Sequence, residues 1–437
     1  MTVGELKTIQ FDKPVVAGSL KVPGDKSISH RAIMLGSIAT GKTTVKGFLE
    51  GEDCLRTIDI FRQLGVSIER NGTDVLIESP GIHQWKTPVG ELYAGNSGTT
   101  ARLLLGILSG SSVNSVLTGD DSLSKRPMKR VTNPLQAMGA SISGASEGDF
   151  LPLSIKGGAL KGIDYEMPVA SAQVKSAILF AGLNAEGITV VRESAISRDH
   201  TERMFKQFGA NIQQDGNAVS LQSGQELKGT DVVVPGDISS AAFFMAAAAM
   251  IKGSSIKFID VGLNPTRTGI IKVLEKMGAS VEILEQYGEN EEPYGIIRVS
   301  NSQLKGIVIE GDIIPTLIDE LPIIALLATQ AEGVTIIKDA EELRVKETDR
   351  IAAVTNELIK LGAEIEATED GMIIKGPTPL KGSNLKSYGD HRLGMMAAIA
   401  ALITEGPVEI ENPSCIAISY PNFFEQLSDL IKKGEDE

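Results

Sequence analysis

The sequence predicts an α/β fold built from six copies of one unit in two similar halves, and three observations support this. Apolar helices recur after short polar segments. Each is followed by small or turn-forming residues and then by a β-branched run. Between them lie amphipathic helices that end in Gly before a short alternating strand. Alternating helical and strand periods are typical of α/β proteins, and self-similarity at about 70 residues indicates the architecture more firmly than local propensity does.

The first apolar helix is expected within residues 24–39, where a polar start leads into an apolar run. The other five apolar helices open at Gly95, Ser171, Gly236, Ile318 and Gly389. Turn residues after each helix interrupt the helical period, and β-branched residues favour strands. The strands that follow are expected at 43–48, 111–119, 186–191, 253–259, 332–337 and 405–410.

The amphipathic helices lead into short alternating strands after a Gly. These strands are expected at 64–69, 138–143, 208–213, 277–282 and 361–366. The sixth such helix is predicted at 423–434 and ends the chain where the next strand would follow. At the other end, a loose terminus is expected to lead into a strand at 19–24.

Two Pro-Gly pairs, at 23–24 and 235–236, predict the domain boundaries. Residues 24–236 form an inserted domain of three copies, and 1–23 with 237–437 form a discontinuous domain that holds the other three. The chain then crosses between domains at 23–24 and at 235–238. Two crossings side by side make a hinge, and ligands favour the cleft between domains.

Composition excludes several classes of protein. The net charge of −14 disfavours nonspecific binding to nucleic acid or to an anionic membrane. Cys54 and Cys415 provide neither a disulfide framework nor a zinc-site spacing. The longest apolar run, at 241–251, is too short to span a bilayer, and no secretory signal is visible. A reducing cytoplasm is therefore the expected compartment.

Residues 36–43, GSIATGKT, match the phosphate-loop pattern GxxxxGK[ST] of nucleotide-binding proteins. In a phosphate loop a strand precedes the first Gly and the Lys opens a helix. Here the order is reversed, because Gly36 falls inside an apolar helix and Lys42 begins a strand. A P-loop kinase is therefore a disfavoured alternative.

Polar residues at the first helix start could bind an anion. Lys26 lies at the helix mouth, Arg31 follows Ser27 by four residues and shares its face, and Asp25 or Ser27 can cap the helix. Free N–H groups and the helix dipole add partial positive charge. The alternative is an ordinary capped surface helix with two solvated cations.

Further polar groups lie at three other places. Gly98 in NSGTTAR lets the backbone approach an anion, and Arg126 precedes Pro127, which favours extended backbone and presentation from a loop. Ser171, Gln173 and Ser197 are short neutral hydrogen-bonding groups that suit hydroxyls and phosphate oxygens. Simple helix caps and a solvated charge run remain the alternatives.

The last third of the chain adds more charge. A helix that starts near Lys346 would place Lys346 and Arg350 on one face, which indicates either a bound anion or pairing with Glu347 and Asp349. Arg392 lies in a first helical turn beside His391, which is expected to be structural.

The spacing around Asp319 favours a helix cap, although a carboxylate among cations could also act as a general base. Altogether six cations, Lys26, Arg31, Arg126, Lys346, Arg350 and Arg392, come from four separate places in the chain. Their number predicts two polyanionic ligands that carry phosphate and carboxylate groups. No metal-ligand spacing, Gly-x-Ser-x-Gly elbow or GxGxxG turn is present, so we expect group transfer with no metal and no cofactor.

Together these motifs resemble the 5-enolpyruvylshikimate-3-phosphate synthase family. GDKSISHR, GNSGTTAR, KRPM, SAQVKSA, the IDE segment, LRVKETDR, GDHR and SYPNFFEQL occur in the family's order over nearly the whole chain. The resemblance implies the two-domain enolpyruvyl transferase fold, an inside-out α/β barrel with three βαβαββ units per domain. It also implies transfer of the enolpyruvyl group of phosphoenolpyruvate to the 5-hydroxyl of shikimate 3-phosphate. Phosphate is released, and the reaction lies on the route to chorismate and the aromatic amino acids.

The resemblance further implies roles for individual residues, without a cofactor and in a monomer. Asp319, Glu347 and Lys26 would be catalytic. Shikimate 3-phosphate would be held by Lys26, Ser27, Arg31, Ser171, Gln173, Ser197, Asp319 and Lys346. Phosphoenolpyruvate would be held by Lys26, Gly98, Arg126, Gln173, Arg350 and Arg392.

Some positions depart from the family pattern. Ala172 replaces a second Ser, Glu342 replaces Asn, and residues 418–419 lack a Lys that some members have. These changes resemble the glyphosate-tolerant subgroup. The remaining alternative is the sister enolpyruvyl transferase that acts on UDP-N-acetylglucosamine. Its catalytic acid is a loop Cys, and the Arg126 loop has none.

Overall fold

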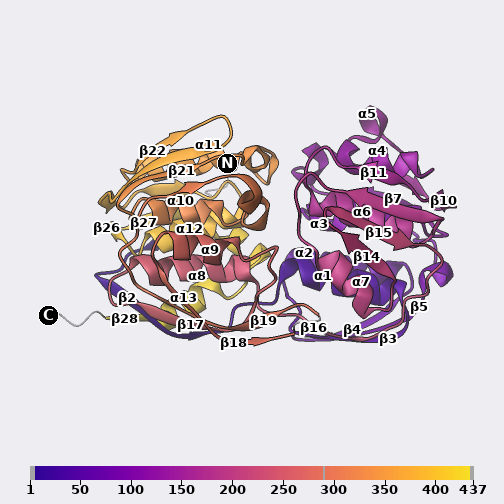
Figure 1. The fold of residues 1–437 in the computed structure, drawn as a ribbon, viewed down its shortest axis with the longest axis horizontal. Helices are drawn as coiled ribbons and strands as arrows, with labels where there is room; N and C mark the ends of the chain where they lie inside the picture. The colour runs from indigo at the N-terminus through magenta and orange to yellow at the C-terminus, as the bar shows by residue number, and fades with distance from the viewer. Residues whose placement is uncertain (1–4, 289–290, 434–437) are drawn as a thin grey trace. The chain divides into compact units, whose positions relative to one another are not determined.

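The computed structural model describes residues 5–288 and 291–433. Contacts divide the chain into two compact units. The inserted unit is Gly24–Val234, and the terminal unit combines residues up to Pro23 with those from Pro235 onward. Both units mix helices and strands (Figure 1). Residues 235 and 236, which the sequence analysis placed in the inserted domain, belong to the terminal unit, where the Gly236 N–H donates to the Asp260 carbonyl at 2.7 Å.

The inserted unit contains three repeats of helix, strand, helix and hairpin. The first repeat is α1 (Lys26–Ile38), β3 (Thr40–Lys46), α2 (Glu52–Gln63), β4 (Ser67–Asn71) and β5 (Asp74–Pro80). The second is α3 (Gly98–Ser109), β7 (Asn114–Thr118), α4 (Lys129–Ala137), β8 (Ser141–Gly144) and β9 (Leu153–Lys156). The third is α6 (Ala172–Gly182), β13 (Ile188–Arg192), α7 (His200–Gln207), β14 (Ile212–Asp215) and β15 (Ala218–Gln222).

The three sheets of the inserted unit share one topology. The strand orders are β16-β3-β5-β4, β6-β7-β9-β8 and β11-β13-β15-β14, with the first pair parallel and the other two antiparallel. The added strands are β6 (Leu92–Tyr93), β11 (Asp164–Glu166) and β16 (Asp231–Val233). Short elements complete the unit: β10 (Leu160–Lys161), β12 (Ala185–Glu186), α5 (Ala145–Gly148), and the 3₁₀ turns η1 (Ile82–Gln84) and η2 (Leu123–Lys125).

The terminal unit follows the same plan. Its fourth repeat is α8 (Ile238–Met250), β17 (Ser255–Gly262), α9 (Gly269–Lys276), β18 (Ser280–Tyr287) and β19 (Tyr294–Ser300). The fifth is α10 (Leu321–Ala328), β21 (Gly333–Ile337), α11 (Arg350–Lys360), β22 (Glu364–Ala367) and β23 (Met372–Gly376). The sixth is α12 (His391–Ala400), β27 (Val408–Glu411), α13 (Phe423–Leu430) and β28 (Ile431–Lys433). Between them lie β20 (Val308–Ile309), β24 (Leu380–Lys381), β25 (Asn384–Lys386), β26 (Thr404–Glu405), η3 (Gly311–Thr316), η4 (Glu341–Val345) and η5 (Pro413–Ile418).

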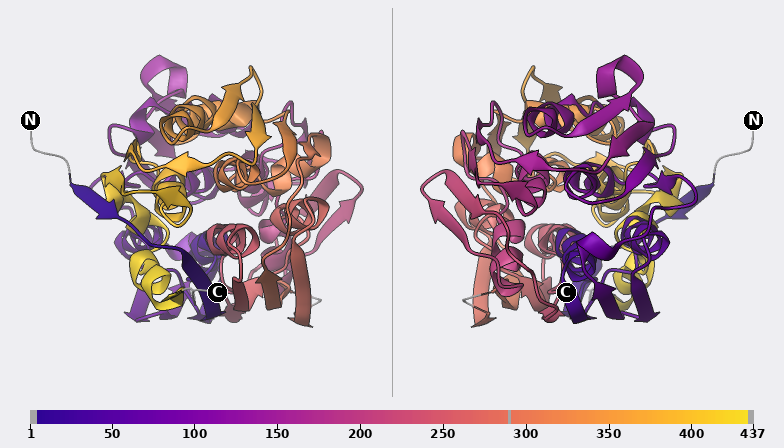
Figure 2. Two further views of the ribbon diagram at one scale, coloured as in Figure 1. Left: turned by 90° about the vertical axis from the view of Figure 1, so that its left-hand side faces the viewer. Right: turned by 90° about the vertical axis from the view of Figure 1, so that its right-hand side faces the viewer.

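The N-terminus completes the sixth repeat. β1 (Leu6–Ile9) pairs antiparallel with β27. In the sheets of the other repeats this position is held by the second strand of the hairpin. β2 (Pro14–Leu20) lies between β17 and β28. The left view of Figure 2 shows the indigo N-terminal segment beside yellow C-terminal elements of the same unit. The terminal unit is therefore closed by strands from opposite ends of the chain.

Three predictions at the chain ends were wrong. The strand expected at 19–24 lies at Pro14–Leu20, because the β-branched pair at 15–16 pairs with β28 and residues 17–20 pair with β17. Residues 6–9 are a strand and not a loose terminus, because β27 offers them an edge. The helix expected at 423–434 ends at Leu430, where residue 431 turns extended to pair with β2. Residue 434 lies outside the described residues.

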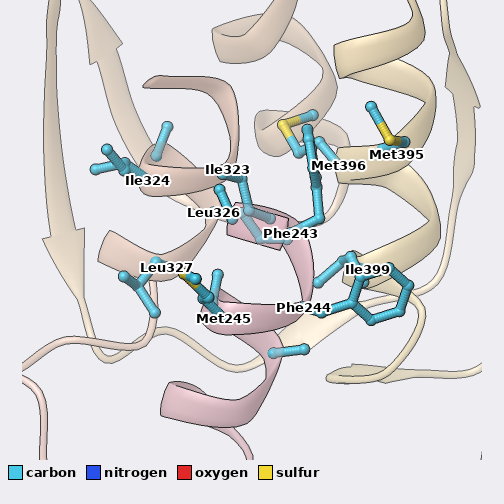
Figure 3. Close-up of a cluster of buried hydrophobic side chains, with 14 of the residues drawn as sticks. Phe243, Phe244, Met245, Ile323, Ile324, Leu326, Leu327, Met395, Met396 and Ile399 are labelled. Atoms are coloured by element: carbon cyan, nitrogen blue, oxygen red, sulfur yellow. The ribbon is translucent and has the colours of Figure 1, made fainter. Parts of the chain in front are cut away.

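Apolar central helices make the core of each unit. α8, α10 and α12 are buried on almost every side, which is the pattern of a helix enclosed by other elements. Figure 3 shows their side chains turned toward one another, among them Phe243, Phe244, Met245, Ile323, Leu326, Met396 and Ile399. α1, α3 and α6 occupy the same place in the inserted unit. Because six polar helix starts lead into these buried helices, the core fixes where the polar residues lie.

The resemblance to a phosphate loop is confirmed to be accidental. Gly36 lies inside α1, and Lys42 lies in the strand that follows, β3. No helix among the described residues is both long and apolar enough to cross a membrane.

Candidate active site

Polar side chains near the N-termini of α1, α3 and α6 are linked in the inserted unit, in part through Thr57 of α2. His30 Nδ1 lies 2.8 Å from Thr57 Oγ1, and Thr57 Oγ1 lies 2.9 Å from Thr100 Oγ1. Gln173 Nε2 donates to Thr99 Oγ1 at 3.0 Å. These bonds place three helix N-termini side by side. Their free N–H groups and dipoles favour negative charge there.

Lys26 opens α1 beside a carboxylate. The cap of this helix is Asp25 and not Ser27, since Asp25 Oδ1 accepts the N–H of Ile28 at 2.9 Å. Lys26 Nζ lies 2.5 Å from Asp53 Oδ2. The ammonium group is therefore held in place by an ion pair at the mouth of the helix.

Arg31 is buried, with 3 % of its surface exposed. Its Nε donates to Thr201 Oγ1 at 2.6 Å and its Nη2 to Ser176 Oγ at 2.8 Å, which ties α1 to α6 and α7. Its Nη1 donates to the Ser27 carbonyl at 3.1 Å. Burial, together with the cations of Lys26 and Arg31, holds the pKa of the neighbouring His30 well below its usual range. His30 is therefore a neutral structural group.

Two guanidinium groups flank Gly98, the first residue of α3. A Cβ at Gly98 would lie 3.1 Å from Arg102 Nη1 and 3.5 Å from Arg126 Nη1. Arg126 has extended backbone, as predicted before Pro127, and its Nη2 donates to Asn96 Oδ1 at 2.7 Å. The sequence analysis did not single out Arg102. It is the last letter of NSGTTAR, one helical turn after Gly98, and this spacing could have identified it.

The neutral residues occupy two kinds of position. Ser171 caps α6 by accepting the N–H of Val174 at 3.5 Å. Gln173 accepts from Arg102 Nη1 at 2.8 Å. Ser197, for which a helix cap was one alternative, lies in the loop before α7, where its N–H donates to Glu193 Oε1 at 3.2 Å.

A buried ion cluster that the sequence analysis missed supports the Ser197 loop. Lys175 Nζ lies 2.8 Å from Glu193 Oε2 and 2.7 Å from Glu202 Oε1. Burial opposes the charge on Lys175, but the carboxylates of Glu202 and Glu193 outweigh it and raise the pKa of Lys175. Lys175 lies within SAQVKSA, yet spacing alone gives no signal that a Lys is buried.

In the terminal unit, Arg350 gathers three carboxylates. Its Nε donates to Asp390 Oδ2 at 2.8 Å, its Nη1 to Asp319 Oδ1 at 3.1 Å and its Nη2 to Glu347 Oε2 at 2.7 Å. Burial opposes the charge on Arg350, but Asp390, Glu347 and Asp319 outweigh it and raise its pKa. The two carboxylates that the sequence analysis singled out thus share one guanidinium.

Lys346 reaches this group by a different route from the one predicted. The helix begins at Arg350 and not near Lys346, which follows η4, so the two do not share a helix face. They meet at Asp319, whose Oδ1 lies 4.0 Å from Lys346 Nζ. Lys346 Nζ also donates to Glu342 Oε1 at 3.2 Å. Pairing with acids, one of the two alternatives, is therefore present, although Asp349 instead caps α11 and pairs with Arg344.

Asp319 is not the helix cap that its spacing favoured. α10 begins at Leu321, and its cap position is held by Glu320. The main chain turns into α10 after the preceding η3, which leaves the Asp319 carboxylate facing Arg350. A carboxylate beside two cations can accept a proton from a bound hydroxyl, provided that the hydroxyl lies within hydrogen-bond reach.

Arg392 lies in the first turn of α12. Its N–H donates to Asp390, the cap of that helix, at 2.8 Å, and its Nε donates to His391 Nε2 at 3.1 Å. His391 therefore orients Arg392, which agrees with a structural role. Because Asp390 also binds Arg350, the two arginines belong to one network.

The predicted residues thus form two groups. The inserted-unit cluster is Lys26, Ser27, Arg31, Gly98, Arg126, Ser171, Gln173 and Ser197. The terminal-unit cluster is Asp319, Lys346, Glu347, Arg350 and Arg392. The first combines helix N-termini with cations, which suits phosphate and carboxylate groups. The second combines cations with carboxylates that can transfer protons.

Known proteins resemble the chain along nearly its whole length. A model of the EPSP synthase (3-phosphoshikimate 1-carboxyvinyltransferase) family matches residues 12–427. Curated proteins named 3-phosphoshikimate 1-carboxyvinyltransferase include one from Bacillus licheniformis, 58% identical over 418 residues (95% of this chain and 98% of that protein). Another from Bacillus pumilus is 59% identical over 416 residues (95% and 97%).

Solved structures show the same architecture. An EPSP synthase from Acinetobacter baumannii superposes with a TM-score of 0.88 at 46% identity, covering 98% of this chain and all of that one (100%). The enolpyruvyl transferase NikO from Streptomyces tendae has a TM-score of 0.81 at 17% identity, and the match covers 99% of this chain and 100% of that one. At that identity the second likeness shows the fold alone. The predicted enolpyruvyl transferase fold is confirmed.

Proposed function

The chain belongs to the EPSP synthase (3-phosphoshikimate 1-carboxyvinyltransferase) family, and we propose that it transfers an enolpyruvyl group from phosphoenolpyruvate to the 5-hydroxyl of shikimate 3-phosphate. Inorganic phosphate is released, and the reaction belongs to the shikimate pathway of aromatic amino-acid biosynthesis. The observation that carries this conclusion is the near-full-length similarity to relatives that bear this enzyme name. The two charged clusters suit a pair of small polyanions.

Shikimate 3-phosphate draws on both clusters in this proposal. Its phosphate is assigned to Ser171, to the Ser197 hydroxyl, which would exchange Glu193 for the phosphate, and to the first turn of α6, whose N-terminus favours an anion. Lys26, Ser27, Arg31 and Gln173 complete the inserted-unit side. Asp319 and Lys346 hold the ring hydroxyls from the terminal unit.

Phosphoenolpyruvate is assigned to the cations. Lys26, Arg126 and Gln173 bind it from the inserted unit, with Gly98 leaving room for the ligand between guanidinium groups. Arg350 and Arg392 bind it from the terminal unit. A planar guanidinium matches the two oxygens of a carboxylate or phosphate, which supports arginine in these places.

The proposed reaction has two stages. Glu347, with Lys26 assisting, delivers a proton to the methylene carbon of phosphoenolpyruvate, and the adjacent carbon becomes electrophilic. Asp319 takes the proton of the 5-hydroxyl as its oxygen bonds to that carbon. Glu347, now a carboxylate, takes back a proton from the new methyl group as the tetrahedral intermediate expels phosphate, which restores the enol double bond. Cations that offset the repulsion of two anions and hold them in place can lower the barrier by several kcal/mol.

Both clusters must reach the same ligands in this mechanism. We infer that the crossings at 23–24 and 235–238 act as a hinge that brings the inserted-unit and terminal-unit clusters onto the bound pair. The short length of both crossings and their adjacency, with the Asp237 N–H donating to the Pro23 carbonyl at 2.9 Å, support this inference.

The test of function is phosphate release from phosphoenolpyruvate with each acceptor in turn. We expect release with shikimate 3-phosphate and none with UDP-N-acetylglucosamine. Release with the UDP sugar alone would assign the chain to the sister transferase. Binding of phosphoenolpyruvate without release from either acceptor would make it a noncatalytic binding protein, and release that requires ATP would indicate a kinase.

We further propose that the enzyme tolerates glyphosate. Ala172 lacks the hydroxyl of a second Ser at the start of α6, and Glu342 pairs with Lys346 where other members have Asn. The guanidinium groups of Arg102 and Arg126 lie 3.1 and 3.5 Å from where a Cβ at Gly98 would be, so changes around Gly98 alter what a ligand meets there. Inhibition by micromolar glyphosate in competition with phosphoenolpyruvate would contradict this proposal.

Finally, we propose a cytoplasmic monomer. The reducing cytoplasm suits a chain whose cysteines, Cys54 and Cys415, are both buried and unbridged. Light scattering after size-exclusion chromatography tests the oligomeric state, and the mass of a dimer would contradict it.

A further inference from the structure

The turn that leads into α12 is bonded to a buried carboxylate that the proposed mechanism does not use. Glu357 lies in α11 with 1% of its surface exposed. Its Oε1 accepts the hydroxyl of Tyr388 at 2.7 Å, and its Oε2 accepts the N–H of Lys386 at 2.9 Å. Lys360 Nζ, one turn later in α11, lies 2.6 Å from Oε2 and balances its charge. The carboxylate therefore bonds to the turn at two residues, Lys386 and Tyr388.

The turn needs such a constraint because its backbone is unusual. Tyr388 has a φ of 56° and Gly389 a φ of 72°, so two consecutive residues are left-handed. Glycine adopts this conformation freely, but a tyrosine side chain makes it costly. Burial and the bond to Glu357 raise the pKa of Tyr388 to about 12, so its hydroxyl remains a donor near neutral pH.

α11 holds the turn at its other end as well. Arg350, the first residue of α11, binds Asp390 through Nε at 2.8 Å, and Asp390 in turn accepts the N–H of Arg392 at 2.8 Å. Glu357 lies two helical turns after Arg350 on the same helix. One rigid helix thus fixes residues on both sides of Gly389, and Arg392 follows directly.

We propose that Glu357 and Tyr388 are positioning residues for Arg392, setting its guanidinium for phosphoenolpyruvate through the left-handed turn at 388–389. The inference rests on the proposed function, in which Arg392 binds that ligand. Neither residue belongs to the set assigned above to either substrate. Loss of the Tyr388 hydroxyl lets the turn relax, and Arg392 then samples directions that do not meet the anion.

The test is the variant Tyr388→Phe, which removes one hydroxyl from an exposed side chain. We expect the KM for phosphoenolpyruvate to rise about fivefold, the effect of one net hydrogen bond, while the KM for shikimate 3-phosphate and kcat change less than about twofold. Tyr287→Phe is the matched control. Tyr287 is an exposed tyrosine of the same unit whose hydroxyl also bonds a carboxylate, Glu285.

A second variant separates this inference from the proposed function. Arg392→Lys should raise the KM for phosphoenolpyruvate by itself. In the double variant with Tyr388→Phe, the fold increase in that KM should be smaller than the product of the two single-variant increases. If Arg392→Lys raises that KM and Tyr388→Phe leaves it unchanged, the positioning role is wrong while the assignment of Arg392 stands. If Arg392→Lys also leaves it unchanged, the assignment fails and the inference fails with it. A uniform loss of kcat together with a lower melting temperature in Tyr388→Phe would show only a structural role.

Discussion

Single residues show how the protein keeps so many charges together before a ligand arrives. Lys26 is paired with Asp53, and Arg350 is paired with Asp390, Asp319 and Glu347. Bringing like charges together without such partners is destabilising. A bound anion can then take over bonds that a carboxylate now makes, which frees that carboxylate for proton transfer.

Lys26 provides the first test at this scale. Lys26→Ala should lower kcat by at least about a hundredfold, because it removes a cation that binds both ligands and assists protonation. Circular dichroism should stay near that of the parent protein, with a modest fall in melting temperature because Asp53 loses its ion pair. Lys338→Ala, which breaks the exposed pair with Glu310, is the control. A rate near that of the parent in Lys26→Ala would refute the role of this residue.

His30 predicts a pH dependence of stability. Its pKa is lowered well below 6.5 in the folded protein, by burial first and then by Lys26 and Arg31. As the pH falls below about 6.5, the unfolded chain takes up a proton at this position and the folded chain does not. The free energy of unfolding should therefore fall, by up to ~1.4 kcal/mol per pH unit from this group. It is recovered as the pH rises through 6.5.

The measurement is urea denaturation across the range from neutral to about pH 5, a window in which His30 titrates in the unfolded state. His30→Gln should show a shallower fall on the acidic side than the parent protein. His83→Gln, at an exposed position, should keep the parental slope. An equal slope in the parent and His30→Gln would contradict the prediction.

At the scale of elements, close contact between helices sets the place of the polar helix starts. α3 and α6 approach each other at Gly106, where a Cβ would lie only 2.0 Å from the Ala177 carbonyl oxygen. Gly98 and Gln173 lie at the N-terminal turns of these two helices. The distance between these two positions thus depends on Gly106, two helical turns after Gly98.

Gly106→Ala should destabilise the protein by about 3 kcal/mol or more, because backbone must move to admit the methyl group. We also expect a higher KM for phosphoenolpyruvate. The control is Gly36→Ala in α1, where the Cβ would meet side chains and no backbone, the tip of Ile77 at 2.7 Å and Thr43 at 3.1 Å, and should cost less. Equal melting temperatures for the two variants would show that the α3–α6 contact can yield.

At the scale of the whole molecule, two units of the same plan each provide half of the proposed site. The inserted unit is one continuous segment, whereas the terminal unit joins both ends of the chain through β1, β27, β2 and β28. Each unit has its own buried core, and therefore each can move as a body. A ligand held by both clusters is the physical reason for the proposed closure.

One variant in each unit tests this sharing. Ser197→Ala and Lys346→Ala should both raise the dissociation constant of shikimate 3-phosphate, by about fivefold or more for each lost hydrogen bond. Isothermal titration calorimetry measures it directly. The radius of gyration from small-angle scattering should fall when the parent protein binds this ligand. An effect confined to variants of one unit, with no change in the radius, would show that the two clusters do not share the ligand.

The sequence by itself determined the α/β class, the six repeats and most polar residues of the two clusters. Helix caps, turn residues and hydrophobic periods act between neighbours in the chain, so they can be read from spacing. Two predictions from the sequence were wrong: Asp319 is not a helix cap, and Lys346 does not start a helix. The reason is that the turns before α10 and α11 follow tertiary packing.

Only the tertiary structure decided which groups meet. Several bonded pairs are apart in sequence and adjacent in space: Arg350 with Asp390, Lys175 with Glu193, Glu357 with Tyr388, and strand β1 with β27. No local period encodes a bond across that separation. Burial makes such bonds obligatory, since a charge enclosed in the core is stable only beside its partner.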